Sequence, residues 1–177
     1  MRRKAFISVF VLALLAPATA FALQAAGGDG TLVVQNGTAP KGVPVATLVI
    51  TGAVIGQISG SGKVVIDDPT PNDNNPAEVT GYTWHRTTVL PTDDTEDTYG
   101  GVGPNFRFRA VGGTYKIVLY GSDVDLVASG QGTVVLTGSS DVPSADGRYS
   151  VNGQGFKSLP ATPTKPFKIS SPTSATG

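Results

Sequence analysis

Apolar and polar residues alternate most clearly between residues 105 and 120, on either side of the pair Gly112-Gly113. Strict alternation predicts strands whose side chains point to two faces of a sheet. A Gly-Gly pair predicts a tight hairpin loop, because glycine tolerates the positive φ that such a loop needs. In that register the core face carries three opposed pairs: Ala110 and Tyr115, Phe108 and Ile117, and Phe106 and Leu119. The other face carries Arg107, Arg109 and Lys116, with Arg109 directly opposite Lys116.

Similar patterns, separated by residues that favour turns, predict further strands along the chain. They cover residues 31–35, 45–51, 53–58, 63–68, 78–90, 148–152, 156–159 and 166–170, and residues 106–137 read as a four-stranded meander. Near Gly52 the pattern fits either two strands or one long strand with a bulge. Residues 91–104 read as a long polar loop. The chain therefore predicts an all-β fold, a single antiparallel β-sandwich or partly closed barrel of about nine or ten short strands over residues 31–170.

The N-terminus carries a targeting pattern. Three cations, Arg2, Arg3 and Lys4, precede an uncharged apolar run over residues 5–16, and two A-x-A cleavage signals lie between Ala18 and Ala22. The apolar run is shorter than the roughly 20 residues that span a bilayer. It therefore predicts a cleaved signal peptide over residues 1–22 and no transmembrane segment in the mature chain. Residues 23–30 read as a flexible leader and residues 171–177 as a disordered tail.

Composition narrows the function classes. The chain contains no cysteine, so a domain that we expect to be secreted needs no disulfide. Removing the three N-terminal cations from 13 basic and 13 acidic residues leaves the acids in slight excess. Such a balance argues against nucleic acid as a partner, because phosphate binding depends on clustered Lys and Arg. The C-terminal part, residues 147–177, contains four cations and no acid.

Residues 67–97 are the acidic part of the chain, with Arg86 as the single cation. Their hard oxygen ligands suit calcium: Asp67, Asp68, Asp73, Asn75, Asp93, Asp94, Glu96 and Asp97. The loops lack the ligand order of an EF-hand, and we expect solvated acidic loops rather than a metal site. A hydrolase or lyase with two converging carboxylates is the alternative. We also expect residues 93–97 to fold back over Arg107, Arg109 and Lys116 through exposed ion pairs. The alternative is that these three cations stay open and bind an anionic cell-wall polymer or a lipid surface.

Residues 78–90 offer a second set of candidates. Tyr82, Trp84 and Arg86 alternate on one face if the strand is regular, and aromatic rings with arginine are enriched at binding surfaces. The pattern nevertheless favours Trp84 as a core side chain, because Thr83, His85 and Thr87 would form a natural outer face. His85 is the single histidine and so would be the base of any serine triad. Nothing in the sequence pairs it with a nucleophile, and we predict no catalytic residue and no cofactor.

Three segments, GTLVVQNG (30–37), GAVIG (52–56) and RFRAVGGTYKI (107–117), resemble a group of uncharacterised exported bacterial all-β proteins. That resemblance implies the all-β fold and export, and it implies no activity and no site residue. The sequence thus predicts a secreted, non-enzymatic β-domain that binds an extracellular glycan, a cell-wall polymer or another protein.

Overall fold

The structure is a computed structural model of the 177-residue chain. It describes residues 29–35, 42–68, 75–91, 95–101, 105–139 and 147–170. The expected signal peptide (1–22), most of the leader and the tail (171–177) lie outside these ranges. Among the described residues, no helix is long and apolar enough to cross a membrane.

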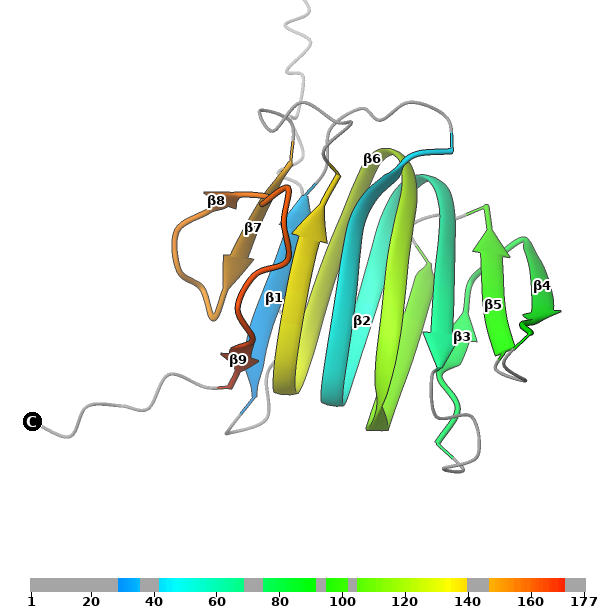
Figure 1. Ribbon diagram of the computed structural model, residues 1–177, viewed down its shortest axis with the longest axis horizontal. Coiled ribbons are helices and arrows are strands. Elements are labelled where there is room, and N and C mark those ends of the chain that lie inside the picture. Colours follow the sequence, from blue (N-terminus) through cyan, green and yellow to red (C-terminus); the bar gives the residue numbers. More distant parts are fainter. Residues whose placement is uncertain are drawn as a thin grey trace, which may run out of the picture.

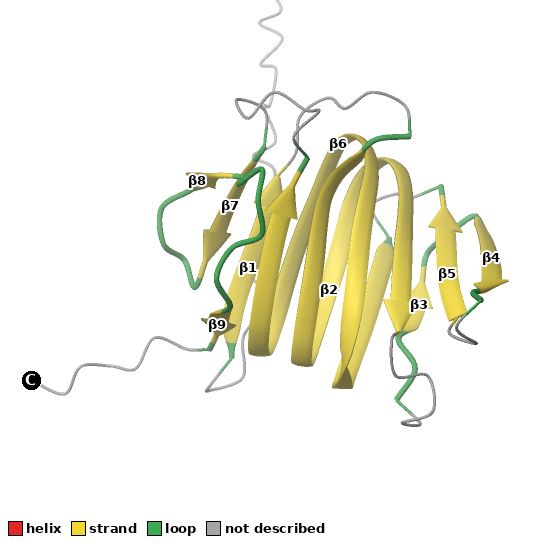
Figure 2. Ribbon diagram, in the orientation of Figure 1, coloured by secondary structure: helices red, strands yellow, loops and turns green. Residues whose placement is uncertain are grey.

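Nine antiparallel strands and no helix make up the described part of the chain (Figure 2). They are β1 (Gly30–Gln35), β2 (Pro44–Asp68), β3 (Glu78–Thr80), β4 (Trp84–Val89), β5 (Thr95–Gly100), β6 (Phe106–Gly138), β7 (Arg148–Val151), β8 (Lys157–Ser158) and β9 (Phe167–Ile169). The sheet order is β4-β5-β2-β6-β1-β7-β8, with β3 and β9 paired to β6, and the sheet is not closed into a barrel. The all-β antiparallel prediction is confirmed.

The centre of the sheet consists of two very long strands wound round each other (Figure 1). β2 lies between two successive stretches of β6: Ile50, for example, pairs with Tyr115 on one side and with Val134 on the other. The structure therefore has two long strands, β2 with 25 residues and β6 with 33 residues, where the sequence predicts a series of short strands.

β6 lies between stretches of β2 in the same way, since Ile117 pairs with both Leu48 and Ile66. The expected meander over residues 106–137 is therefore wrong in its connectivity. The apolar stretches were recognised correctly, but each pairs with β2 instead of with the next stretch of β6. Because non-local pairing of this kind leaves no signature in local sequence, alternation alone could not reveal it.

Glycines stand opposite one another where the wound strands change direction. Gly52 pairs with Gly113 on one side and Gly132 on the other. A Cβ on Gly52 would lie 2.4 Å from the carbonyl oxygen of Gln131, and the φ of Gly52 is +139°. Close approach of two backbones with positive φ is tolerated by glycine alone. Of the two interpretations at Gly52, one continuous strand is confirmed.

The expected hairpin at Gly112-Gly113 is wrong, because the chain continues through a bulge there. Gly112, with φ +85°, is the extra residue: Ala110 pairs with Val54 and Gly113 pairs with Gly52. A hairpin loop and a bulge both use a glycine at positive φ. Both also bring Ala110 and Tyr115 to the same face of the sheet, so the sequence pattern did not distinguish them.

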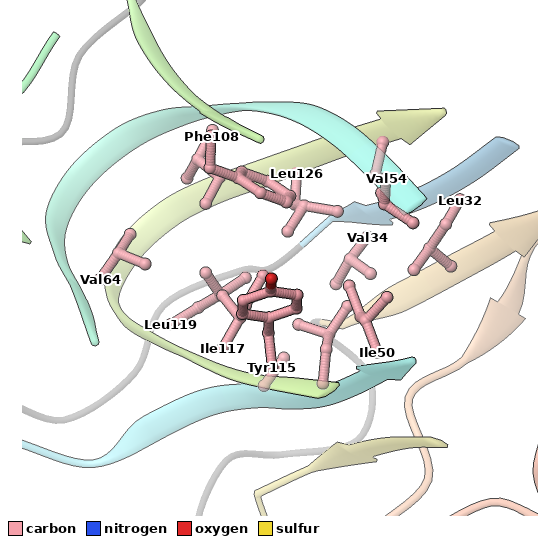
Figure 3. Close-up of a cluster of buried hydrophobic side chains, with 14 of the residues drawn as sticks. Leu32, Val34, Ile50, Val54, Val64, Phe108, Tyr115, Ile117, Leu119 and Leu126 are labelled. Carbon is pink, nitrogen blue, oxygen red and sulfur yellow. The ribbon is translucent and has the colours of Figure 1, made fainter. Parts of the chain in front are cut away.

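The side chains assigned to the core face are nevertheless buried as expected: Phe106, Phe108, Ala110, Tyr115, Ile117 and Leu119. They join one cluster with apolar residues of β1 and β2. Figure 3 shows side chains of these three strands converging on one interior, with the ribbon of β2 curving round it. We call the side of the sheet that faces this cluster the inner face and the opposite side the outer face.

Two expectations between residues 78 and 104 are also wrong. The strand expected over residues 78–90 is interrupted at Gly81, which has φ +82°, so β3 and β4 are separate and pair with different strands. The expected loop over residues 91–104 contains β5, which pairs with both β2 and β4. β5 has the sequence TEDTYG. Its Glu, Asp and Gly residues have a low strand propensity, which is why the sequence alone predicts a loop there.

Candidate functional site

β4 is the strand at one end of the sheet, and it differs from every other strand of its length. Among the described residues it pairs with β5 alone, and all six of its residues are exposed. Of the exposed large hydrophobic side chains in the described ranges, three lie on or beside β4: Tyr82 (41%), Trp84 (49%) and Val89 (68%). Figure 1 places β4 and β5 together at one side of the molecule, at the opposite end from β7 and β8. Exposed apolar side chains gathered at one sheet edge are a typical sign of an interaction surface.

The two faces of β4 follow from its pairing with β5. His85 lies opposite Tyr99, and Trp84 lies opposite Gly100. Tyr99 is buried and its ring contacts that of Phe106 at 6.0 Å between centroids, so Tyr99 and His85 are on the inner face. Because successive side chains of a strand alternate, Trp84 and Arg86 are on the outer face. The expectation that Trp84 lies in the core is therefore wrong.

The indole of Trp84 lies across Gly100. A Cβ built on Gly100 would come 1.9 to 2.2 Å from the indole atoms Cε2, Nε1 and Cζ2, so only glycine leaves room for the ring. Thr83 fixes the start of β4 at the same place, since its backbone N–H (3.0 Å) and its hydroxyl (3.1 Å) both donate to the carbonyl of Gly100. One side of the ring is thus supported by backbone, and half of the side chain remains open to water.

Tyr82 does not share a face with Trp84 and Arg86, which corrects the expected three-residue set. Its ring lies 5.1 Å from that of Tyr99 and 5.7 Å from that of His85, on the inner face. The bends at Gly81 and Thr83 break the two-residue period between Tyr82 and Trp84. Burial, then the charge of Asp97 and then Tyr82, raise the pKa of Tyr99 above its usual value.

His85, Asp97 and Thr87 form a polar cluster on the inner face. The His85 Nε2 atom is 2.9 Å from Oδ1 of Asp97, and the Thr87 hydroxyl donates to the same oxygen at 2.6 Å. In a nucleophile–base pair the hydroxyl donates to the imidazole. Here the hydroxyl is satisfied by the carboxylate, and its distance to Nε2 is 3.4 Å. The cluster ties β4 to β5 and lacks the geometry of an activated nucleophile.

Two cations lie on the outer face of this part of the sheet, one on the strand of Trp84 and one beyond β5. Arg86 is two residues along β4, and Lys63 of β2 lies opposite Gly100, in line with Trp84 across the sheet. The ammonium of Lys63 lies 4.4 Å from the centre of the Tyr120 ring. We call Trp84, Arg86, Gly100 and Lys63 the Trp84 surface. Farther into the sheet the outer-face residues Val65 and Val118 are only 5% and 7% exposed, so the outer face is covered there.

The basic face expected from Arg107, Arg109 and Lys116 does not form. Arg109 pairs with Ile55 and its guanidinium lies 3.1 Å from the carboxylate of Glu78. Lys116 pairs with Val49, beyond the corner at Gly112, and its ammonium lies 3.7 Å from the carboxylate of Asp67. Arg107 is exposed and lies opposite Thr80 of β3. The expected repulsion between Arg109 and Lys116 is therefore absent.

The acidic loop does not cover these cations. Asp97 faces His85 instead, and the partners of Arg109 and Lys116 come from β3 and β2. The prediction is therefore wrong for the acids that the structure describes. Asp93 and Asp94 lie outside the described residues.

The candidate calcium ligands are divided between the two faces of the sheet. Asp67 and Glu96 are directly opposite on the outer face, whereas Asp97 points to the inner face beside Ile66. Asp68 ends β2 opposite Thr95, and Asn75 accepts the hydroxyl of Tyr115 through its backbone carbonyl. In the part of the chain that the structure describes, no three His, Cys, Asp or Glu residues are grouped as metal ligands would be. Asp73 lies outside that part.

Sequence reasoning identified Trp84 and Arg86 but not the two residues that complete their surroundings. Lys63 comes from a strand distant in sequence, and Gly100 comes from a segment that reads as a loop. The glycine content of residues 98–101 was the available signal, because a glycine on a strand often marks the close approach of another group. Comparison of the chain with protein-family models, curated proteins and solved structures finds no match.

Proposed function

We propose that the protein is a non-enzymatic binding domain that holds an extracellular polysaccharide on the Trp84 surface. The single observation that carries this proposal is the half-exposed indole of Trp84, supported on Gly100 at an open sheet edge. Aromatic rings are the largest apolar side chains, and leaving half of one in water forgoes about 2 kcal/mol of burial. Because the backbone at Gly100 supports one side of the indole, the other side is available for contact with a flat partner.

A sugar ring matches this surface chemically. The axial C–H bonds of a pyranose give it an apolar face that stacks on an aromatic ring, and the sugar hydroxyls accept hydrogen bonds from neighbouring donors. Arg86 supplies such donors beside the indole. An open edge rather than a closed cavity accommodates the interior of a long polymer, because a chain can pass across it in both directions.

The protein would meet such a polymer outside the cell. The basic N-terminus, the apolar run and the A-x-A signals support export, as argued above. N-terminal sequencing of the protein released into the medium should give Leu23 or Phe21 as the first residue. A released chain that retains residues 5–16 would contradict export by a cleaved signal peptide.

Binding can be followed directly, because Trp84 is the single tryptophan of the chain. Titration with soluble polysaccharides should change its fluorescence. In affinity electrophoresis, Trp84→Ala should weaken binding at least about tenfold, the factor that corresponds to about 1.4 kcal/mol. Phe156→Ala is the matched control, since Phe156 is equally exposed (50%) but lies next to β8 at the other end of the sheet. Equal affinity of Trp84→Ala and the parent protein would contradict the proposal.

A hydrolase acting on such a polymer is the second candidate, and one observation favours it. Asp67 and Glu96 lie directly opposite each other on the outer face, and a glycosidase needs two carboxylates that face one cleft. The ion pair between Asp67 and Lys116 provides a structural use for one of them. If Asp67→Asn or Glu96→Gln abolished the release of reducing sugars by the parent protein, the hydrolase would replace the binding domain.

A further inference from the structure

The charged side chains near Trp84 indicate which charge a ligand of this surface should have. Residues 67–97 are strongly acidic. Of the described acids on β5, Asp97 points to the opposite face, and Glu96 lies on the outer face opposite Thr88, farther along the strand than Arg86. The outer face at the indole therefore shows Arg86, and Lys63 of β2 lies across the sheet from it.

Neither cation is neutralised by a described carboxylate. The three ion pairs within the described residues involve His85, Arg109 and Lys116. Lys63 instead contacts the ring of Tyr120, which places its ammonium without supplying a negative charge. Arg86 is exposed and keeps its planar set of donors for a partner.

The positions of the two cations suit a polymer with repeated charges. Lys63 lies two strands from Trp84, which is about 9 to 10 Å across the sheet, and Arg86 lies about 7 Å along the strand. A sugar chain that crosses this sheet edge from the indole would thus meet Arg86 on β4 and, beyond β5, the ammonium of Lys63 over the Tyr120 ring. Arginine binds carboxylate and sulfate oxygens through two parallel N–H donors, which makes it selective for such groups.

We infer that the ligand of the Trp84 surface is an anionic polysaccharide, whose carboxylate or sulfate groups bind Arg86 and Lys63 while a sugar ring stacks on Trp84. This inference rests on the proposed function and adds the chemical class of the polymer. It also predicts a dependence on salt, because contacts between exposed charges are screened.

The test compares polymers that differ in charge alone. Polygalacturonate and its fully methyl-esterified form share one backbone, and dextran sulfate and dextran form a second pair. With the purified chain in low salt, Trp84 fluorescence should report at least about tenfold tighter binding of the charged member of at least one pair. That preference should fall at least threefold when the salt concentration is raised to about 0.5 M. The pair that shows the preference identifies carboxylate or sulfate as the group bound.

Variants connect the preference to the two cations. Arg86→Gln and Lys63→Gln retain Trp84 as the reporter, and each should reduce the affinity for the charged polymer at least threefold more than it reduces the affinity for the neutral partner. Arg107→Gln is the matched control, because Arg107 is an exposed arginine on another part of the sheet. Its affinity for both polymers should equal that of the parent protein.

The outcomes separate the inference from the proposed function. Equal binding of charged and neutral polymers, still weakened by Trp84→Ala, would overturn the anionic ligand and keep the polysaccharide-binding surface. Binding that Trp84→Ala leaves unchanged would overturn both. An equal loss in Arg107→Gln and Arg86→Gln would show general attraction between charges and would also overturn the assigned contacts.

Discussion

The wound pair β2 and β6 and the edge strand β4 were all predicted as strands from the sequence, but only the wound pair enters the core. Alternate residues of β2 and β6 are fully buried, among them Leu48, Ile50, Leu126 and Leu136. β4 was also predicted as an alternating strand, but all of its residues are exposed. Alternation therefore determines which side chains share a face, while the presence of other strands over that face determines whether it becomes core.

The wound region depends on close backbone contacts, and this gives the largest predicted effect. Gly121→Ala would bring a Cβ to 2.1 Å from the carbonyl oxygen of Ser61 at a φ of +132°. We expect a loss of at least about 3 kcal/mol in the free energy of unfolding, measured by chemical denaturation. Gly155→Ala is the control, because nothing lies within 4 Å of its added Cβ, and it should change stability by less than about 0.5 kcal/mol. Equal losses would mean that the corner is not closely packed.

Truncation of an aromatic side chain in each region sharpens the comparison. Phe108 is 3% exposed and packs against Gly56, so Phe108→Ala should cost about 3 to 5 kcal/mol. Trp84→Ala removes a larger ring from β4 but should cost less than about 1.5 kcal/mol, because half of that ring is already in water. Denaturant midpoints measure both losses. A similar loss for the two variants would contradict the exposed placement of Trp84.

Tyr99 of β5 contacts both His85 of β4 and Phe106 of β6. Its raised pKa makes the free energy of unfolding depend on pH in the alkaline range. Burial raises the pKa of Tyr99 in the folded protein above the value of about 10 that it has in the unfolded chain. Above pH 10 the unfolded chain releases this proton and the folded protein retains it. Stability should therefore fall by up to about 1.4 kcal/mol per pH unit above pH 10.

Comparison with Tyr99→Phe isolates this contribution. The variant should lose less stability than the parent protein between pH 10 and pH 11 in denaturation curves. The same slope in both proteins would show that Tyr99 already ionises in the folded state.

The smallest predicted effect is that of the His85 and Asp97 pair. Both side chains are 34% exposed, and exposed ion pairs contribute about 0 to 1 kcal/mol. Asp97→Asn should therefore lower stability by less than about 1 kcal/mol in thermal unfolding near neutral pH. Thr98→Ser, on the outer face of the same strand, is a conservative control. A loss above 2 kcal/mol would mean that the edge pair is as cooperative a part of the fold as the wound strands.

The candidate site was predictable only in part, as two residues show. Arg86 and Trp84 were recognised because they are two residues apart, and residues two apart on a strand lie on the same face whatever the strand pairs with. Trp84 was nevertheless assigned to the core, because Thr83, His85 and Thr87 would form a natural outer face. Its exposure results from Gly100 of β5, which supports the ring from a segment whose composition reads as a loop.

By itself, the sequence determined the all-β class, the buried face and the places where glycine is required. These follow from side-chain alternation and from the backbone freedom of Gly52 and Gly112, and both act within a few residues. Only the tertiary structure decided that Gly112 forms a bulge, that Arg109 binds Glu78 rather than opposing Lys116, and that Lys63 lies in line with Trp84 across β5. Each of these depends on which distant strand lies alongside. Since many registers satisfy the same alternation, the choice among them is made by the packing of the whole core.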